Sequence, residues 1–241
     1  MLRVAVIGAC GRMGSTVCAA VEGDPELELV ARVGSKDGLG LVLDVGADVA
    51  VEFTLPASVK ANTVWLLEHG VHTVVGATGL SDADLEELAG LTGPANCFVA
   101  PNFAVGAVLM MRMAELCARH FDLVEVIELH HERKVDAPSG TALRTARMIA
   151  AVRAKNGLST PLPGLNDQPS RGLTVDGVPI HSVRLPGIVA SHEVVFGGPG
   201  QTLRLRHDSI DRSSFMPGVL LAVKRVASVP GLTVGLEALL G

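Results

Sequence analysis

Residues 3–14 read Arg3-Val4-Ala5-Val6-Ile7-Gly8-Ala9-Cys10-Gly11-Arg12-Met13-Gly14, which is a short apolar run, a glycine-rich turn and the start of a helical pattern. Glycines between a strand and a helix permit a tight turn and a close approach of the backbone to a ligand. The first amide groups of the helix then attract an anion. The stretch predicts a turn that binds the pyrophosphate of a dinucleotide through Gly8, Ala9, Cys10, Gly11, Arg12 and Met13. Its spacing, G-x-x-G-x-x-G, departs from the commoner G-x-G-x-x-G, and a tight turn without a ligand is the alternative.

The first hundred residues alternate short β-branched runs with stretches of helical spacing. Apolar runs of this kind are typical of parallel strands that are buried on both faces. We expect strands at 3–7, 29–33, 49–53, 73–75 and 97–99, and helices at 13–21, 57–68 and 83–91. Ser81 and Asp84 form a capping-box pattern before the last of these helices. The pattern predicts an α/β fold with a doubly wound, parallel dinucleotide-binding sheet.

From about residue 104 the pattern changes. A long helix (105–120), a strand (124–129) and a helix that opens near Ser139 precede a Pro/Gly-rich loop at 155–172. Strand-like runs at 180–185, 193–196 and 202–206 then follow one another through short turns, which predicts a second α+β domain with a mixed, mostly antiparallel open sheet. A last helix, 213–226, has an apolar face that we expect to pack on the first domain. The predicted domains are therefore 1–103, completed by 213–241, for dinucleotide binding, and 104–212 for substrate binding and oligomerisation.

Composition excludes several classes of protein. The 241 residues are 48% hydrophobic and 19% charged, which suffices for a core, and the net charge of −5 argues against broad nucleic-acid binding. No run approaches the ~20 apolar residues that cross a bilayer, and residues 1–8 predict a strand and turn rather than a signal peptide. The four cysteines are far apart and predict buried free thiols in a reducing compartment, hence a cytoplasmic protein: Cys10, Cys18, Cys97 and Cys117.

The end of the second predicted strand bears on the choice of cofactor. An Asp or Glu is usual there, where it binds the adenosine ribose, but Val33 is followed by Gly34, Ser35 and Lys36. A hydroxyl and a cation favour the 2′-phosphate of NADPH, although Lys36 as a solvated loop residue is an equal alternative. Two later strand ends are predicted to flank the nicotinamide, with turn glycines as the alternative at the first: Gly76, Ala77 and Thr78, and Ala100, Pro101, Asn102 and Phe103.

Residues 128–142 hold most of the polar chemistry of the chain. His130, His131, Arg133 and Lys134 form a cationic cluster at a strand end in an acidic protein, as an anionic substrate requires. Ser139, Gly140 and Thr141 open a helix whose amide and hydroxyl groups can bind a carboxylate. Adjacent residues of a strand point to opposite faces, so one of the two histidines has an even chance of being structural. A metal site is less favoured, because no set of ligands with suitable spacing accompanies the histidines.

These motifs together resemble the dihydrodipicolinate reductase family. The resemblance runs from the turn at 8–14 through 76–79, 100–103 and 130–142 to 207–209 and 212–215, and the string His-His-x-x-Lys-x-Asp-Ala-Pro-Ser-Gly-Thr is its most specific part. It implies that His130 and Lys134 transfer protons and that His131, Gly140 and Thr141 bind substrate. It also implies that the earlier loops hold NADPH or NADH, and that the second-domain sheet assembles a homotetramer.

The implied reaction is reduction of 4-hydroxy-tetrahydrodipicolinate to tetrahydrodipicolinate, a step of lysine and diaminopimelate biosynthesis. The substrate is a cyclic imine with two carboxylates, which matches the cationic cluster and the helix start. Two other classes are weighed against it. One is another two-domain reductase, such as an amino-acid or semialdehyde dehydrogenase, although no cysteine is set up as a nucleophile. The other is a nucleotide sensor without catalysis, which leaves His130 and Lys134 unexplained.

Overall fold

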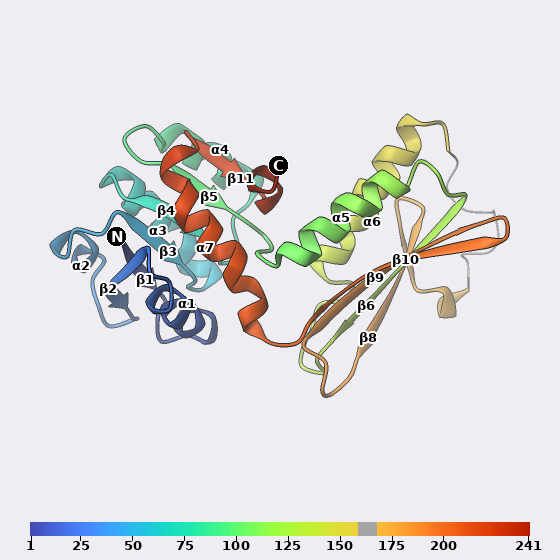
Figure 1. Ribbon diagram of the computed structural model, residues 1–241, viewed down its shortest axis with the longest axis horizontal. Coiled ribbons are helices and arrows are strands. Elements are labelled where there is room, and N and C mark those ends of the chain that lie inside the picture. Colours follow the sequence, from blue (N-terminus) through green and yellow to red (C-terminus); the bar gives the residue numbers. More distant parts are fainter. Residues whose placement is uncertain (159–167) are drawn as a thin grey trace. The chain divides into compact units, whose positions relative to one another are not determined.

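The computed structural model describes residues 1–158 and 168–241, in two units (Figure 1). Unit 1 comprises Met1–Val105 and Arg212–Gly241, and unit 2 comprises Gly106–Asp211. Residues 159–167 of the expected loop at 155–172 lie outside the described residues. Its described ends are the last residue of a helix, Lys155, and a 3-10 turn at Pro169–Arg171.

Unit 1 is built on a six-stranded sheet in which every neighbouring pair is parallel, in the order β11-β5-β4-β3-β1-β2. Valine and alanine are buried on both sides of its central strands, and so those strands have no polar face. The strands are β1 (Leu2–Ile7), β2 (Leu27–Val33), β3 (Val49–Glu52), β4 (His72–Val75), β5 (Cys97–Val99) and β11 (Leu232–Val234).

Helices cover both faces of this sheet. One face carries α1 (Arg12–Glu22) and α7 (Met216–Arg225), which pack against each other. The other carries α3 (Pro56–Glu68) and α4 (Asp82–Leu91), whose apolar residues form a buried cluster with β4 and β5. The short helix α2 (Gly40–Asp44) packs beside β2. The predicted capping box at α4 is confirmed, with Ser81 and Asp84 bonded reciprocally.

The C-terminal segment Arg212–Gly241 belongs to unit 1. Val219 and Val223 of α7 are fully buried, and β11 adds the edge strand beside β5. Asn96 joins this segment to the rest of the unit. Its side-chain amide donates to the carbonyls of Val226 and Ala227 at 3.0 and 3.1 Å, and its oxygen accepts from the amide of Gly231.

Unit 2 is built on a five-stranded sheet in the order β10-β9-β6-β8-β7, in which only the β6–β8 pair is parallel. Both parts of the predicted fold class are therefore confirmed. The strands are β6 (Leu123–His130), β7 (Leu173–Val175), β8 (Val178–Arg184), β9 (Ala190–Gly198) and β10 (Gln201–Ser209). The sequence did not predict β7, because a strand of three mostly exposed residues is too short to carry a periodic pattern.

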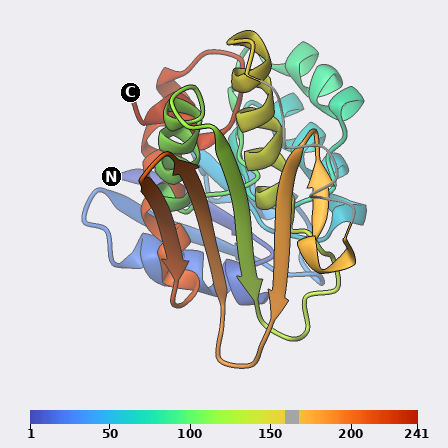
Figure 2. The same ribbon diagram turned by 90° about the vertical axis from the view of Figure 1, so that its right-hand side faces the viewer.

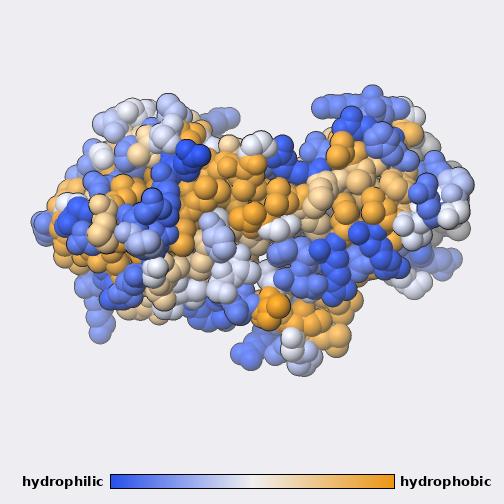
Figure 3. All heavy atoms as spheres, viewed as in Figure 1, coloured by the Kyte–Doolittle hydropathy of each residue, from blue (hydrophilic) through white to orange (hydrophobic). Residues whose placement is uncertain are grey.

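Two helices, α5 (Val105–Cys117) and α6 (Gly140–Lys155), lie behind this sheet in Figure 2. Gly106 opens α5 against the ring of His207, which a β-carbon at position 106 would approach to 2.5 Å. Along α5 the side chains of Leu109, Met113 and Leu116 are exposed, and orange spheres mark this apolar helix in Figure 3. The face of the sheet turned to the viewer in Figure 2 carries no described helix.

The cysteine prediction is only half right. Cys18 and Cys97 are buried, and burial raises the pKa of the Cys97 thiol to about 12. Cys117 is half-buried and Cys10 is exposed, because it lies in the glycine turn rather than within a strand or helix. Among the described residues no helix is long and apolar enough to cross a membrane.

Candidate active site

The glycine turn after β1 has no room for a side chain at Gly8 or at Gly14. Gly8 has a positive φ of 81°, and a β-carbon there would lie 2.7 Å from the carbonyl oxygen of Phe53. A β-carbon on Gly14 would lie 2.1 Å from the carbonyl oxygen of Gly8. Helix α1 begins after Gly11, and no side chain caps it. The turn thus brings bare backbone and an uncapped helix start together, which is the cradle that a pyrophosphate requires.

The loop after β2 contains a carboxylate that sequence analysis missed. Asp37 Oδ2 accepts a hydrogen bond of 2.8 Å from the amide of Gly34, so the carboxylate lies at the end of β2 after all. Its position three residues beyond the expected place concealed it. Ser35 and Lys36 are exposed in the same loop. A negative and a positive charge therefore stand side by side where the adenosine ribose binds in folds of this class.

Two further loops meet at the ring of Phe53. Gly76 packs against it so closely that a β-carbon would lie 2.1 Å from the ring, and the Phe103 ring lies 6.1 Å from it between centroids. Thr78 is exposed, whereas the side-chain oxygen of Asn102 accepts from the amide of Ala104 at 2.9 Å. The loops at 76–79 and 100–103 thus meet on one edge of the sheet, the carboxyl edge, as their positions after β4 and β5 require.

Glu52, the last residue of β3, is buried at this same edge. Burial raises its pKa, although hydrogen bonds from Thr54 and Asn62 oppose the shift. Asn62 donates to Glu52 Oε1 at 3.0 Å, and the amide of Thr54 lies 3.3 Å from both carboxyl oxygens. The side chain therefore joins the middle of α3, at Asn62, and the loop residue Thr54 to the end of β3.

In unit 2, the polar cluster surrounds the end of β6. His130 is the last residue of the strand, and its ring is 17% exposed. Lys134 lies in the loop beyond it, where Nζ contacts both carboxylate oxygens of Asp136 at 2.8 Å. This contact lowers the pKa of Asp136. The Lys134 side chain is 22% exposed, and its ammonium group is paired with the carboxylate of Asp136 near the surface.

Helix α6 opens directly after this loop, and the peptide bond before Pro138 is cis. Ser139 is the N-cap residue: its hydroxyl accepts from the amide of Ala142 at 3.2 Å, as predicted for a helix start. Ser139 itself is buried, while Gly140 is exposed and Thr141 half-buried. Of the three predicted anion-binding residues, Gly140 and Thr141 therefore offer the more accessible groups.

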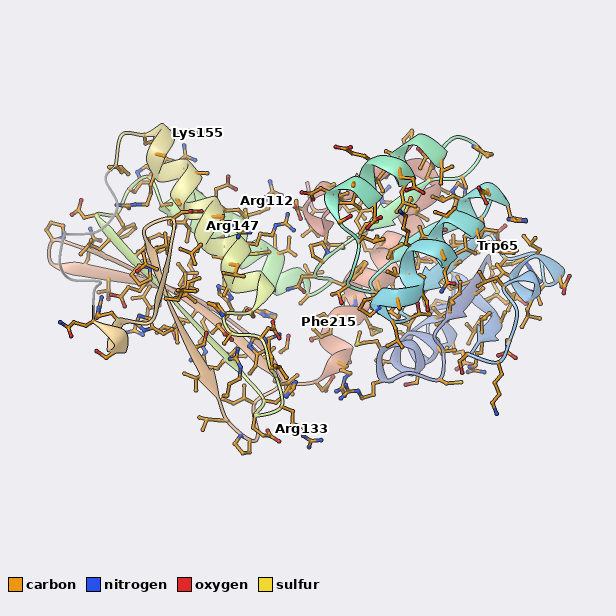
Figure 4. All side chains as sticks on the ribbon, turned by 180° about the vertical axis from the view of Figure 1, so that it is seen from behind. Trp65, Arg112, Arg133, Arg147, Lys155 and Phe215 are labelled. Atoms are coloured by element: carbon orange, nitrogen blue, oxygen red, sulfur yellow. The ribbon has the colours of Figure 1, made fainter. Side chains whose placement is uncertain are left out.

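The cationic residues of the cluster do not all converge. His131 is exposed, and Arg133 is 87% exposed, pairs with Glu132 and points away from the sheet in Figure 4. Sequence analysis missed two residues that lie at the centre instead, Glu128 and Arg184. Glu128 is a charged residue, yet its side chain has no exposed surface. It occupies a position of β6 that the alternation of buried and less buried residues assigns to the interior. A carboxylate at such a position was the available signal.

The electrostatics of Glu128 follow from its partners. Burial alone would raise its pKa, but hydrogen bonds from His130, Arg184 and Ser182 lower it to about 2. His192, opposite Glu128 on β9, is buried as well, and burial lowers its pKa to about 4. At neutral pH the centre therefore holds an ionised carboxylate and a neutral imidazole. No group of His, Cys, Asp and Glu side chains in the described residues could hold a metal ion.

A parallel sheet with a glycine turn, in one chain with a second domain that carries a cationic cluster, defines the class of two-domain nicotinamide-dinucleotide reductases. Residues 2–103 match the family model described as dihydrodipicolinate reductase, N-terminus, and residues 106–240 match the model for its C-terminus. The chain belongs to the dihydrodipicolinate reductase family.

Relatives over nearly the full length agree. The chain is 53% identical to 4-hydroxy-tetrahydrodipicolinate reductase of Streptomyces griseus, over 98% of this chain and 96% of that protein. It is also 53% identical to the protein of that name from Nocardia farcinica, over 99% and 98%. A solved dihydrodipicolinate reductase from Paenisporosarcina sp. TG-14, with dipicolinate bound, matches with a TM-score of 0.88 and 38% identity over 99% of both chains. An amine dehydrogenase from Mycobacterium smegmatis shares the fold alone, with a TM-score of 0.63 and 15% identity.

Proposed function

We propose that this chain reduces 4-hydroxy-tetrahydrodipicolinate to tetrahydrodipicolinate with NADPH or NADH, in lysine and diaminopimelate biosynthesis, and that His130 and Lys134 are its proton-transfer groups. The reaction itself accords with the family to which the chain belongs. The observation that carries the residue assignment is the cluster at the end of β6. An ammonium group, an imidazole and the start of α6 occur there within a few residues of one another.

The proposed chemistry assigns each group one task. Substrate carboxylates bind at the start of α6, at Gly140 and Thr141, and beside His131, where backbone amides and the cationic residues oppose their charge. The 4-hydroxyl group of the substrate leaves as water to give a conjugated ring, and the dinucleotide, when bound, would supply the hydride that reduces this ring. Lys134 Nζ then donates a proton to the negative charge that develops on the ring, and the His130 ring holds or relays that proton. Lys134 has to leave Asp136 to do so, which makes Asp136 a temporary partner of the ammonium group.

The residues of unit 1 suit a dinucleotide. The pyrophosphate would lie in the turn formed by Gly8, Ala9, Cys10, Gly11, Arg12 and Met13, and the nicotinamide beside 76–78 and 100–103. Ser35 and Lys36 would contact a 2′-phosphate, and Asp37 would contact the ribose hydroxyls of NADH. We therefore infer that the chain accepts both cofactors, with NADPH used at least as well as NADH.

Three further properties complete the proposal. The chain would act in the cytoplasm, for which the four free cysteines are the support, since secreted proteins commonly pair them. It would bind neither nucleic acid nor membrane. It would form a homotetramer through the sheet of unit 2, whose edge strand β10 has nine residues and whose outer face no described helix covers.

The decisive test of the reaction is a spectrophotometric assay of NADPH and NADH oxidation with freshly generated 4-hydroxy-tetrahydrodipicolinate. A 2-oxo acid with ammonia serves as the control for the amino-acid dehydrogenase alternative, and an acyl phosphate serves as the control for the semialdehyde dehydrogenase alternative, because each is the substrate that such an enzyme reduces with NADPH or NADH. We expect oxidation with the cyclic substrate alone. Turnover of a control substrate in its place would contradict the proposal, and binding of NADPH without any turnover would favour a nucleotide sensor.

A further inference from the structure

Donor groups from three elements converge on the carboxylate of Glu128. His130 Nδ1, at the end of β6, lies 2.5 Å from Oε2. Arg184, at the end of β8, donates from Nη1 to Oε2 at 2.9 Å and from Nη2 to Oε1 at 2.8 Å. The amide of Ser139, the N-cap of α6, lies 3.3 Å from Oε1. One buried side chain therefore touches all three elements from which the cluster is built.

Arg184 extends this arrangement to the loop that carries Lys134. Its Nη2 also donates to the carbonyl oxygen of Asp136 at 2.7 Å, and its Nε donates to that of Lys134 at 3.3 Å. Because Glu128 fixes both ends of the guanidinium fork, the same carboxylate determines where this loop backbone lies. Arg184 is 19% exposed, so it joins the buried centre to the accessible loop.

The geometry points to Glu128 as the positioning residue of the proposed proton-transfer site: it holds His130 as the Nδ1–H tautomer and, through Arg184, holds the loop of Lys134 in place. This inference rests on the proposed function. An ionised carboxylate can only accept, so the neutral His130 ring must carry its proton on Nδ1. The other ring nitrogen, Nε2, is then an acceptor. It is thus prepared to take or relay a proton.

Ionisation of Glu128 is consistent with every charged or titratable group that faces it. Hydrogen bonds from His130 and Arg184 keep its pKa near 2 despite burial. His192 on β9 and His207 on β10 lie beyond it in the same row of the sheet, paired through the strand register. Burial lowers the pKa of both histidines, so neither adds a positive charge at neutral pH. Among the residues that the structure describes, His192 Nε2 is buried without a hydrogen-bond partner, so it does not compete for the carboxylate.

The first test is the tautomer of His130 in the parent protein without ligands. Nitrogen-15 NMR of the imidazole at pH 8, assigned by comparison with His130→Gln, distinguishes the two tautomers. We expect Nδ1–H to dominate. An Nε2–H tautomer would overturn the inference, whether or not the protein turns over the proposed substrate.

The second test uses Glu128→Gln with Glu125→Gln as the matched control. Glu125 lies on the same strand and also contacts one arginine and one histidine, Arg171 and His181, but on the opposite face. Glutamine at 128 can donate as well as accept, so we expect mixed tautomers of His130 and a fall in kcat of ~10²-fold or more. NADPH affinity, followed by fluorescence of the single Trp65 in unit 1, should stay within about twofold of the parent value.

The outcomes separate the two claims. If the parent reduces the cyclic substrate but Glu128→Gln keeps its kcat within about threefold, or loses no more than Glu125→Gln, the positioning role is wrong and the proposed function stands. If the parent does not reduce the substrate, the proposed function fails, while the tautomer still reports on Glu128. Should Glu128→Gln not fold, Glu128→Asp replaces it, because its shorter side chain keeps the charge but cannot reach His130 and Arg184 together.

Discussion

Thr141 lies one residue inside α6, at the accessible end of the helix where we propose that a substrate carboxylate binds. Substitution by valine keeps the shape and removes the hydroxyl. Because a contact with a carboxylate acts in the ground state, Thr141→Val should raise the KM for substrate by about tenfold and lower kcat less. Thr145→Val is the matched control, since the Thr145 hydroxyl donates inward to the carbonyl of Thr141. Steady-state kinetics measure this effect. An equal KM for the cyclic substrate in the two variants would show that Thr141 does not bind the substrate.

Single residues also decide the cofactor. The loop after β2 carries Lys36 and Asp37 with opposite charges, and a β-carbon on Gly34 would lie 3.1 Å from Cys10 Sγ and 3.3 Å from Asp37 Oδ2. We expect Lys36→Ala to lower kcat/KM for NADPH by about threefold to tenfold and to leave NADH unchanged. Asp37→Asn, which keeps an acceptor for the amide of Gly34, should shift the ratio toward NADPH. The expectation would be wrong if the parent strongly favoured NADH and neither substitution changed the ratio of kcat/KM for NADPH to kcat/KM for NADH. Lys36 would then be a solvated loop residue.

At the scale of elements, the turn between β1 and α1 leaves the least room for change. Gly14→Ala places a methyl group 2.1 Å from the carbonyl oxygen of Gly8, so the turn has to open. We expect NADPH to bind at least tenfold more weakly and the free energy of unfolding to fall by about 1–3 kcal/mol. Gly90→Ala in α4 is the control, because nothing lies within 4 Å of its β-carbon. Quenching of Trp65 fluorescence and urea unfolding measure the two effects, and equal NADPH affinity in both variants would contradict the expectation.

The elements differ in how well the sequence predicted them. Long apolar strands and the helices between them were predictable, because burial on both faces leaves a continuous pattern in β1 and β3. The edge strands β7 and β11 were not, since three residues with partial exposure carry no periodic signal. At the cluster around the end of β6, the sequence predicted only site residues that lie near one another in the chain. It could not predict Arg184, because only the pairing of β6 with β8 brings it beside His130.

At the scale of the whole molecule, His192 should make stability depend on pH. Burial lowers its folded pKa to about 4 from an ordinary 6.5, so below pH 6.5 the unfolded chain takes up a proton that the folded chain refuses. The free energy of unfolding should be constant above that pH and should fall by about 3 kcal/mol in total as the pH drops toward 4. Glu128 acts in a separate window, since its stabilisation is lost only as the pH falls below 4.5 toward 2.

Urea unfolding followed by circular dichroism at pH 7 and pH 5 measures the effect of His192. The parent should be less stable at pH 5, by about 2 kcal/mol from this residue. His192→Gln, which does not titrate, should lose most of the difference. The lowered pKa of His207 acts in the same direction and accounts for a remainder. Equal stability of the parent at the two pH values would show that His192 is protonated in the folded chain.

At this scale, we propose that the cluster of unit 2 performs the chemistry while unit 1 holds the cofactor. The most direct measurement is kcat for the cyclic substrate in Lys134→Ala and His130→Ala, with the Kd for NADPH determined in the same samples. We predict that each substitution lowers kcat by at least ~10²-fold, the usual loss for a proton-transfer group, and leaves the NADPH Kd unchanged. Turnover of Lys134→Ala within about threefold of the parent, with the variant folded, would contradict the central claim.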